Sequence, residues 1–163
     1  MNAKGLQIST PTDSTIVLTR AFNAPRRLVW EAMFTPDKMR RWMLPPPGWT
    51  MTICECEARV GGALRLVWKS EEADPAMTLH GVFTEVMTHE RIVHTETMVL
   101  GSGQTIGRLV ETHEFVEEGG VTTMRITQVY GSKDDRDGAI ASGMDQGMEA
   151  GYQQLDAMLA QPA

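Results

Sequence analysis

The stretch that decides the fold is residues 134–159, DDRDGAIASGMDQGMEAGYQQLDAML, which has the pattern of one long C-terminal helix. Its larger apolar residues step by three or four positions and form one stripe. They are Ile140, Met144, Met148, Tyr152, Leu155 and Leu159. Gly143, Gly147 and Gly151 repeat every four residues on one face, although each costs about 1 kcal/mol relative to alanine inside a helix. These glycines indicate either close packing of the helix against the sheet or space for a ligand. The two roles could also belong to different glycines.

The rest of the chain supplies the sheet that this helix would cover. Residues 14–22, STIVLTRAF, predict a first strand, and residues 23–43 predict two short helices. Further strands are expected at about 49–59, 62–70, 76–88, 91–99, 106–117 and 121–131. Short glycine turns such as Gly61-Gly62 and Gly119-Gly120 favour an antiparallel meander. The sequence therefore predicts an α+β, two-layer domain with about seven strands.

Length and charge limit the class of protein. A chain of 163 residues with 42% hydrophobic residues fits a single domain over 1–163, whose polar residues 1–12 we expect to be loosely ordered. The formal net charge of −6 argues against binding to nucleic acid or to an anionic membrane. No apolar run approaches the roughly 20 residues that span a bilayer, and the N-terminus lacks the apolar core of a signal peptide. We therefore expect a cytoplasmic protein.

The two cysteines, Cys54 and Cys56, lie two residues apart on an expected strand. Alternate residues of a strand share a face, but a disulfide between them would be strained. We expect two free thiols.

Several short motifs, in order along the chain, resemble those of a known superfamily. They are Thr19–Ala32 (TRAFNAPRRLVWEA), Thr35-Pro36-Asp37 with Arg41-Trp42, Arg59–Gly62 (RVGG), His80-Gly81, Glu90–Val93 (ERIV), and Ser142-Gly143-Met144 with Gly147. Together they resemble the START/Bet v 1-like helix-grip superfamily (SRPBCC), in its branch named after activators of the heat-shock protein 90 ATPase. The resemblance covers about residues 14–160. It implies a curved antiparallel sheet that grips the C-terminal helix around a hydrophobic cavity, and it implies no invariant catalytic residues.

Strand alternation predicts which residues would line such a cavity. Large side chains on the inward face of the sheet should meet the glycine-bearing face of the helix. The expected ligand-binding residues are Trp68, Phe83, Tyr130, Met144, Gly147, Met148 and Tyr152. Trp42 and Leu44, just before the triple proline at 45–47, are expected at the cavity rim.

Polar residues on the strand 106–117 allow two interpretations. Glu111 and His113 share parity with Leu109 and Phe115, so they could lie inside the cavity together with Gln128 and Tyr130. Such a set could provide a polar anchor for a ligand or an acid/base pair. With the opposite register they would face solvent, which the apolar Val110 and Val116 on the other face favour. The two are the weak catalytic candidates of the sequence.

Metal and nucleophile signals are weak. The four histidines show no HxxxH or HExxH spacing, and His94-x-Glu96 and Glu111-x-His113 each offer only two ligands. No GxSxG motif is present. We expect neither a metal nor another cofactor.

The sequence thus favours the binding of a small hydrophobic or aromatic molecule between the sheet and the last helix. One alternative is a cyclase- or hydrolase-type enzyme that uses a polar cavity residue, so the assignment as an enzyme stays open. Another is a chaperone-linked protein-binding module with an apolar patch at 42–47, and a homodimer is possible. The chain shows no counterpart of the N-terminal domain of full-length eukaryotic activators, which argues against a chaperone partner.

Overall fold

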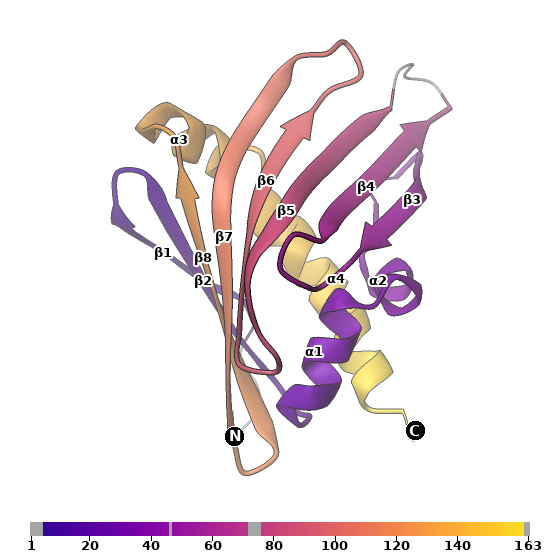
Figure 1. Ribbon diagram of the computed structural model, residues 1–163, viewed down its shortest axis with the longest axis vertical. Helices are drawn as coiled ribbons and strands as arrows, with labels where there is room; N and C mark the ends of the chain where they lie inside the picture. Colours follow the sequence, from indigo (N-terminus) through magenta and orange to yellow (C-terminus); the bar gives the residue numbers. More distant parts are fainter. Residues whose placement is uncertain (1–4, 46, 72–75, 162–163) are drawn as a thin grey trace.

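The computed structural model describes residues 5–45, 47–71 and 76–161. The fold is an eight-stranded antiparallel sheet in the order β1-β2-β8-β7-β6-β5-β4-β3 (Figure 1). Two helices follow β2 in the chain, and two more follow β8. The strands are β1 (Gln7–Thr12), β2 (Thr15–Phe22), β3 (Trp49–Cys56), β4 (Ala63–Ser70), β5 (Met77–Met87), β6 (Arg91–Val99), β7 (Thr105–Glu118) and β8 (Val121–Tyr130). The helices are α1 (Arg26–Phe34), α2 (Pro36–Trp42), α3 (Lys133–Ala141) and α4 (Met144–Leu159).

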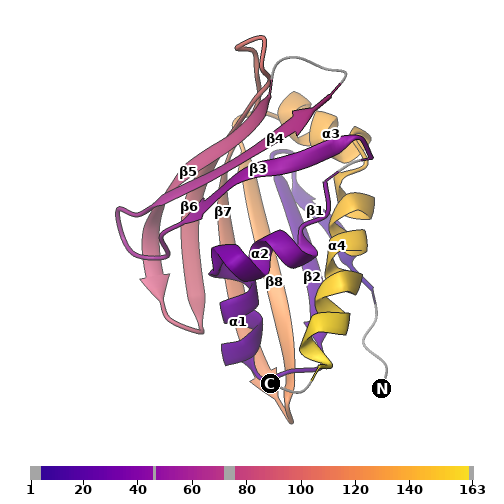
Figure 2. The same ribbon diagram turned by 90° about the vertical axis from the view of Figure 1, so that its right-hand side faces the viewer.

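The sheet curves around α1, α2 and α4, which lie on its concave face (Figure 2). Strand alternation sets this arrangement, because Leu64, Leu66 and Trp68 of β4 are buried while Arg65 and Lys69 point outward and are exposed. The α+β helix-grip architecture is therefore confirmed, with eight strands where about seven were expected. None of the helices in the described ranges is long and apolar enough to cross a membrane.

The additional strand is β1, within the segment that was expected to be loosely ordered. That expectation is wrong for residues 7–12, while residues 1–4 lie outside the described residues. All six residues of β1 are exposed. A strand that buries neither face needs no alternation of apolar and polar residues, so its sequence does not reveal it. Its order comes from backbone pairing with β2, and Pro11 lies where that register shifts, as an edge strand tolerates.

The expected single helix over 134–159 is two helices. Gly143 adopts φ +78°, a left-handed conformation that breaks the helix between α3 and α4, and Gly143 becomes the N-cap of α4. The start of α3 follows the sequence, because the Ser132 hydroxyl accepts a hydrogen bond from the Asp135 backbone N–H. After this break, α4 runs along the concave side of the sheet (Figure 2). Gly143 precedes α4, so it does not share a continuous helical face with Gly147 and Gly151.

One buried arginine fixes α4 to the sheet. Arg20 of β2 is 4% exposed and donates hydrogen bonds to both carboxylate oxygens of Glu149 (3.0 Å each) and of Asp156 (2.7 and 2.8 Å). Glu149 also accepts the backbone N–H of Leu6, which ties the start of the chain to the same helix. Because Glu149 and Asp156 lie two turns apart on α4, one guanidinium sets both the position and the rotation of the helix.

Both cysteines are free, as expected, with Cys54 buried and Cys56 half-buried. Burial raises the pKa of both thiols, and that of Cys56 reaches about 12. We therefore predict that the native protein reacts slowly with Ellman's reagent at pH 8, since the thiolate is the reactive form. Unfolding without reductant should release two fast-reacting thiols per chain. Fast reaction of both thiols in the native state would contradict this prediction.

Candidate ligand cavity

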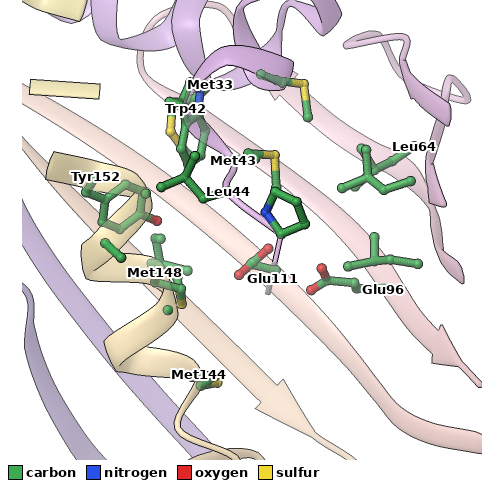
Figure 3. A pocket seen from close by; sticks show the side chains of 18 of the residues that line it. Met33, Trp42, Met43, Leu44, Leu64, Glu96, Glu111, Met144, Met148 and Tyr152 are labelled. Atoms are coloured by element: carbon green, nitrogen blue, oxygen red, sulfur yellow. The ribbon is translucent and has the colours of Figure 1, made fainter. Parts of the chain in front are cut away.

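A cavity of about 630 Å³ lies between the concave face of the sheet, α4, and the segment from α1 to residue 47. Its walls are mostly apolar, and charged and amide side chains line it from β6, β7 and β8. Figure 3 shows two of them, Glu96 and Glu111. The lining side chains include Met33, Phe34, Met39, Trp42, Met43, Leu44, Leu64, Leu66, Trp68, Leu79, His94, Glu96, Glu111, His113, Ile126, Gln128, Met144, Met148 and Tyr152. A space of this size matches small-molecule sites in proteins.

Of the ligand-binding residues expected from the sequence, the structure brings five to this cavity. They are Trp68, Met144, Gly147, Met148 and Tyr152. Phe83 and Tyr130 are not among the lining residues. Phe83 is 1% exposed and packs against the rings of Phe34 and His94, behind the cavity wall. Tyr130 is also buried, and its hydroxyl donates to the side-chain oxygen of Gln128. Both residues are buried, as an inward-facing position requires, but their rings do not line the open space.

The two glycines of α4 have different roles. A Cβ at Gly147 would meet nothing within 4 Å, so this position opens onto the cavity. A Cβ at Gly151 would lie 3.0 Å from the Trp42 carbonyl oxygen, so this glycine permits close approach of α4 to the end of α2. The tertiary structure thus leaves open space beside Gly147 and uses Gly151 for helix packing.

The segment after α2 forms one side of the cavity. Trp42 is buried, donates its indole N–H to the Ala32 carbonyl at 2.8 Å, and stacks at a tilt on Tyr152. Leu44 is 51% exposed and still lines the cavity, so it lies at the mouth. Pro45 and Pro47 also line it, and position 46 of the triple proline lies outside the described residues. Trp42 is consequently part of the wall rather than an exposed patch.

Five polar residues, hereafter the polar cluster, face the cavity from three neighbouring strands. They are His94 and Glu96 of β6, Glu111 and His113 of β7, and Gln128 of β8. His94, Glu111 and Gln128 are direct cross-strand partners in one row, and His113 is two residues along β7 on the same face. Figure 3 shows the carboxylates of Glu96 and Glu111 as neighbours in the cavity.

Glu111 is the centre of the polar cluster. Its Oε1 accepts a hydrogen bond from the Gln128 amide at 2.8 Å, and its Oε2 lies 3.2 Å from Nε2 of His94 and 3.4 Å from Nε2 of His113. Nδ1 of His94 contacts the backbone carbonyl of Thr95 at 3.1 Å. Nδ1 of His113 is buried and has no hydrogen-bond partner within the described part of the chain.

The solvent-facing interpretation of Glu111 and His113 is therefore wrong. Both are buried, at 7% and 4% exposure, whereas Val110 and Val116 are 44% and 59% exposed. Apolar residues on the outer face had supported the opposite register. Pairing with β6 and β8 overrides that pattern, because the inward carboxylate finds imidazole and amide partners on both neighbouring strands.

The cluster has unusual electrostatics. Burial opposes the charged form of His94, but the hydrogen bond and charge of Glu111 outweigh it and raise the His94 pKa to about 9. Burial raises the pKa of Glu111, but the neighbouring His113 and His94 hold that pKa well below its usual range. Burial, followed by the negative charge of Glu111, raises the pKa of Glu96 to about 8. Near neutral pH the cluster holds an ionised Glu111 beside a protonated Glu96.

Sequence reasoning considered Gln128 as part of a polar anchor and His94-x-Glu96 as a weak ligand pair, but it did not join them in one site, and it assigned no role to the methionines of α1 and α2. The signals were present, since His94 and Glu96 share parity and Gln128 shares the inward face of its strand. What was missing was the register, which sets His94, Glu111 and Gln128 side by side. A single sequence does not fix that register.

A curved antiparallel sheet around a C-terminal helix, with a mostly apolar cavity between them, defines a helix-grip cavity protein. The family model described as "Activator of Hsp90 ATPase homolog 1-like protein" matches residues 23–160, and the chain belongs to this family.

Solved structures share the fold. A crystal structure from Rhodobacter sphaeroides is 28% identical, with a TM-score of 0.83 over 95% of this chain and 97% of that one. Protein Ms6760 from Mycobacterium smegmatis is 17% identical, with a TM-score of 0.81 over 99% of each chain. Protein NE0264 from Nitrosomonas europaea is 20% identical, with a TM-score of 0.76 over 92% of this chain and 96% of that one. No protein with a curated description matches the sequence.

Proposed function

We propose that the protein reversibly binds a small hydrophobic or aromatic molecule in the cavity between the sheet and α4. The observation that carries this proposal is the cavity itself, about 630 Å³ in volume with walls of methionine, leucine and aromatic side chains. Methionines such as Met33, Met144 and Met148 adapt to guests of different shape, since the unbranched thioether has several rotamers. The polar cluster offers hydrogen bonds to a polar end of the same guest.

The direct test is native mass spectrometry of the purified protein, followed by titration with the neutral dye N-phenylnaphthylamine. We expect one dye molecule per chain, with enhanced fluorescence, or a co-purified small molecule that the dye displaces. If the folded protein binds neither dye nor guest, the cavity is filled or closed in solution and the proposal is wrong.

The exposed Leu44 at the cavity mouth provides a test of a lid. Leu44→Ala shortens a half-exposed side chain without disturbing the buried Trp42, so we expect dye dissociation to accelerate about threefold while the protein sediments as the parent does. A homodimer through the segment 42–47 would give the opposite pattern. A change in sedimentation with unaltered dye exchange would therefore show that this segment is an interface.

A second candidate, an enzyme of the cyclase or hydrolase type, is favoured by the inward position of Glu111 and His113 beside the open space. A carboxylate and an imidazole in a water-poor cavity can take and return a proton during a reaction. Hydrolysis of a small aryl ester by the parent and by Glu111→Gln tests the hydrolase form. Equal rates in the two proteins would count against it.

A further inference from the structure

We propose that His94, Glu111 and His113 form a binding site for a divalent transition-metal ion, with its open side toward the cavity. One ligand atom from each of these three buried residues lies within 4.8 Å of the other two. Two imidazoles and one carboxylate are a donor set that suits Zn²⁺ or Fe²⁺, and three protein ligands leave a position for water or a guest. The opposite expectation followed from the sequence alone because no ligand pair has the spacing of a helical metal site.

The distances fit an ion. Ligand atoms about 2.0–2.1 Å from a tetrahedral zinc lie about 3.3 Å apart. Oε2 of Glu111 is 3.2 Å from Nε2 of His94 and 3.4 Å from Nε2 of His113. The ligand nitrogens of the two imidazoles lie within 4.8 Å of each other, so a tetrahedral ion would require them to approach by up to about 1.5 Å, through side-chain rotation.

The hydrogen bonds of His94 also fit an ion. The Thr95 carbonyl only accepts, so Nδ1 of His94 carries the proton of that 3.1 Å contact. Nε2 of His94 faces Oε2 of Glu111 at 3.2 Å, a contact that needs a positive charge between the two atoms, which a second ring proton can supply. A metal ion would take the place of that proton and would bind Nε2 of both histidines at once. A histidine that donates its second N–H to a backbone carbonyl is the usual arrangement around protein-bound metals.

Hydrogen bonds also orient the carboxylate of Glu111 for an ion. The Gln128 amide occupies Oε1 at 2.8 Å and leaves Oε2 for the ion, and the Tyr130 hydroxyl holds Gln128 in turn at 2.9 Å. Glu96 adds a second carboxyl group that faces the same space. A divalent cation would offset the negative charge of Glu111 in the buried cluster.

The test is metal binding by protein that has been stripped with a chelator and then exchanged into buffer. We expect one Zn²⁺ per chain, and a visible absorption band when Co²⁺ replaces it. His94→Gln and Glu111→Gln should each lower the affinity by more than about 100-fold, because loss of a supporting residue alone costs 10–100-fold. Gln128→Leu removes the hydrogen bond that supports Glu111, so it should lower the metal affinity by only about 10–100-fold.

Two further variants keep the test decisive. His113→Phe preserves the ring that packs on Phe34 and Phe115, so it should fold and still lose the ion. His80→Gln changes an exposed histidine of β5 and should leave binding as in the parent. Absence of stoichiometric binding, or equal affinity in His94→Gln and the parent, would overturn the site. Dye binding by the metal-free parent is measured separately, so failure of the metal site and failure of the proposed cavity function are distinguishable.

Discussion

Arg20→Ala is expected to lower the free energy of unfolding by about 3 kcal/mol, since removal of one partner from a buried ion pair typically costs 3–5 kcal/mol. The lower end applies because Glu149 and Asp156 are 22% and 42% exposed and regain part of their hydration. The guanidinium is 4% exposed and provides the four hydrogen bonds that hold α4 on the sheet. Urea unfolding followed by circular dichroism measures the loss.

Two variants serve as controls for Arg20→Ala. Arg125→Ala removes an exposed arginine from the outer face of the sheet and should change stability by less than about 0.5 kcal/mol. Arg20→Lys keeps the charge but loses the planar fork, so its stability should lie between those of the parent and the alanine variant. An Arg20→Ala protein as stable as Arg125→Ala would show that the two carboxylates are not held by this residue.

The same ion pair predicts a pH dependence. Hydrogen bonds from Arg20 lower the pKa of Glu149 below its ordinary value of 4.5. The folded state then binds fewer protons at this group than the unfolded chain does, so the stabilisation is fully present above pH 4.5 and is lost as the pH falls through the lower, folded pKa. The stability difference between the parent and Glu149→Gln should therefore shrink below pH 4.5. A difference that is constant down to pH 3 would contradict this linkage.

Gly147→Leu is expected to weaken binding of N-phenylnaphthylamine by about tenfold or more while the fold survives. Gly147 is exposed and lines the cavity, and an added Cβ meets no atom within 4 Å, so a leucine there has room to reach into the cavity and occupy part of the space of the guest. Each CH₂ group of the dye that can no longer be buried lowers the binding free energy by about 0.8 kcal/mol. A loss of about 1.4 kcal/mol, or roughly two such groups, corresponds to a tenfold weaker affinity. Fluorescence titration gives the affinity.

Gly138→Leu is the matched control for Gly147→Leu. Gly138 lies within α3, is exposed, and also has nothing within 4 Å of an added Cβ, but it does not line the cavity. Both substitutions replace a helical glycine and should raise helix propensity by a similar amount. Dye affinity equal in the two variants would mean that the dye does not occupy the space beside Gly147.

The sequence by itself determined the architecture. Alternation on the strands fixed which side chains of β4, β5 and β8 turn inward, and the stripe from Met144 to Leu155 placed a helix over them. These features are local, because periodicities of 2 and 3.6 residues report which face of an element is buried. Five of the seven expected ligand-binding residues lie on the cavity for this reason.

Only the tertiary structure decided the rest. The break at Gly143 and the strand at Gln7–Thr12 depend on backbone conformation and pairing that leave little trace in composition. The polar cluster depends on the pairing of β6, β7 and β8, which sets His94, Glu111 and Gln128 in one row although they lie far apart along the chain. A shift of one residue in that pairing would turn each of them to the outer face, and a preference between registers is a property of the whole sheet rather than of any one strand.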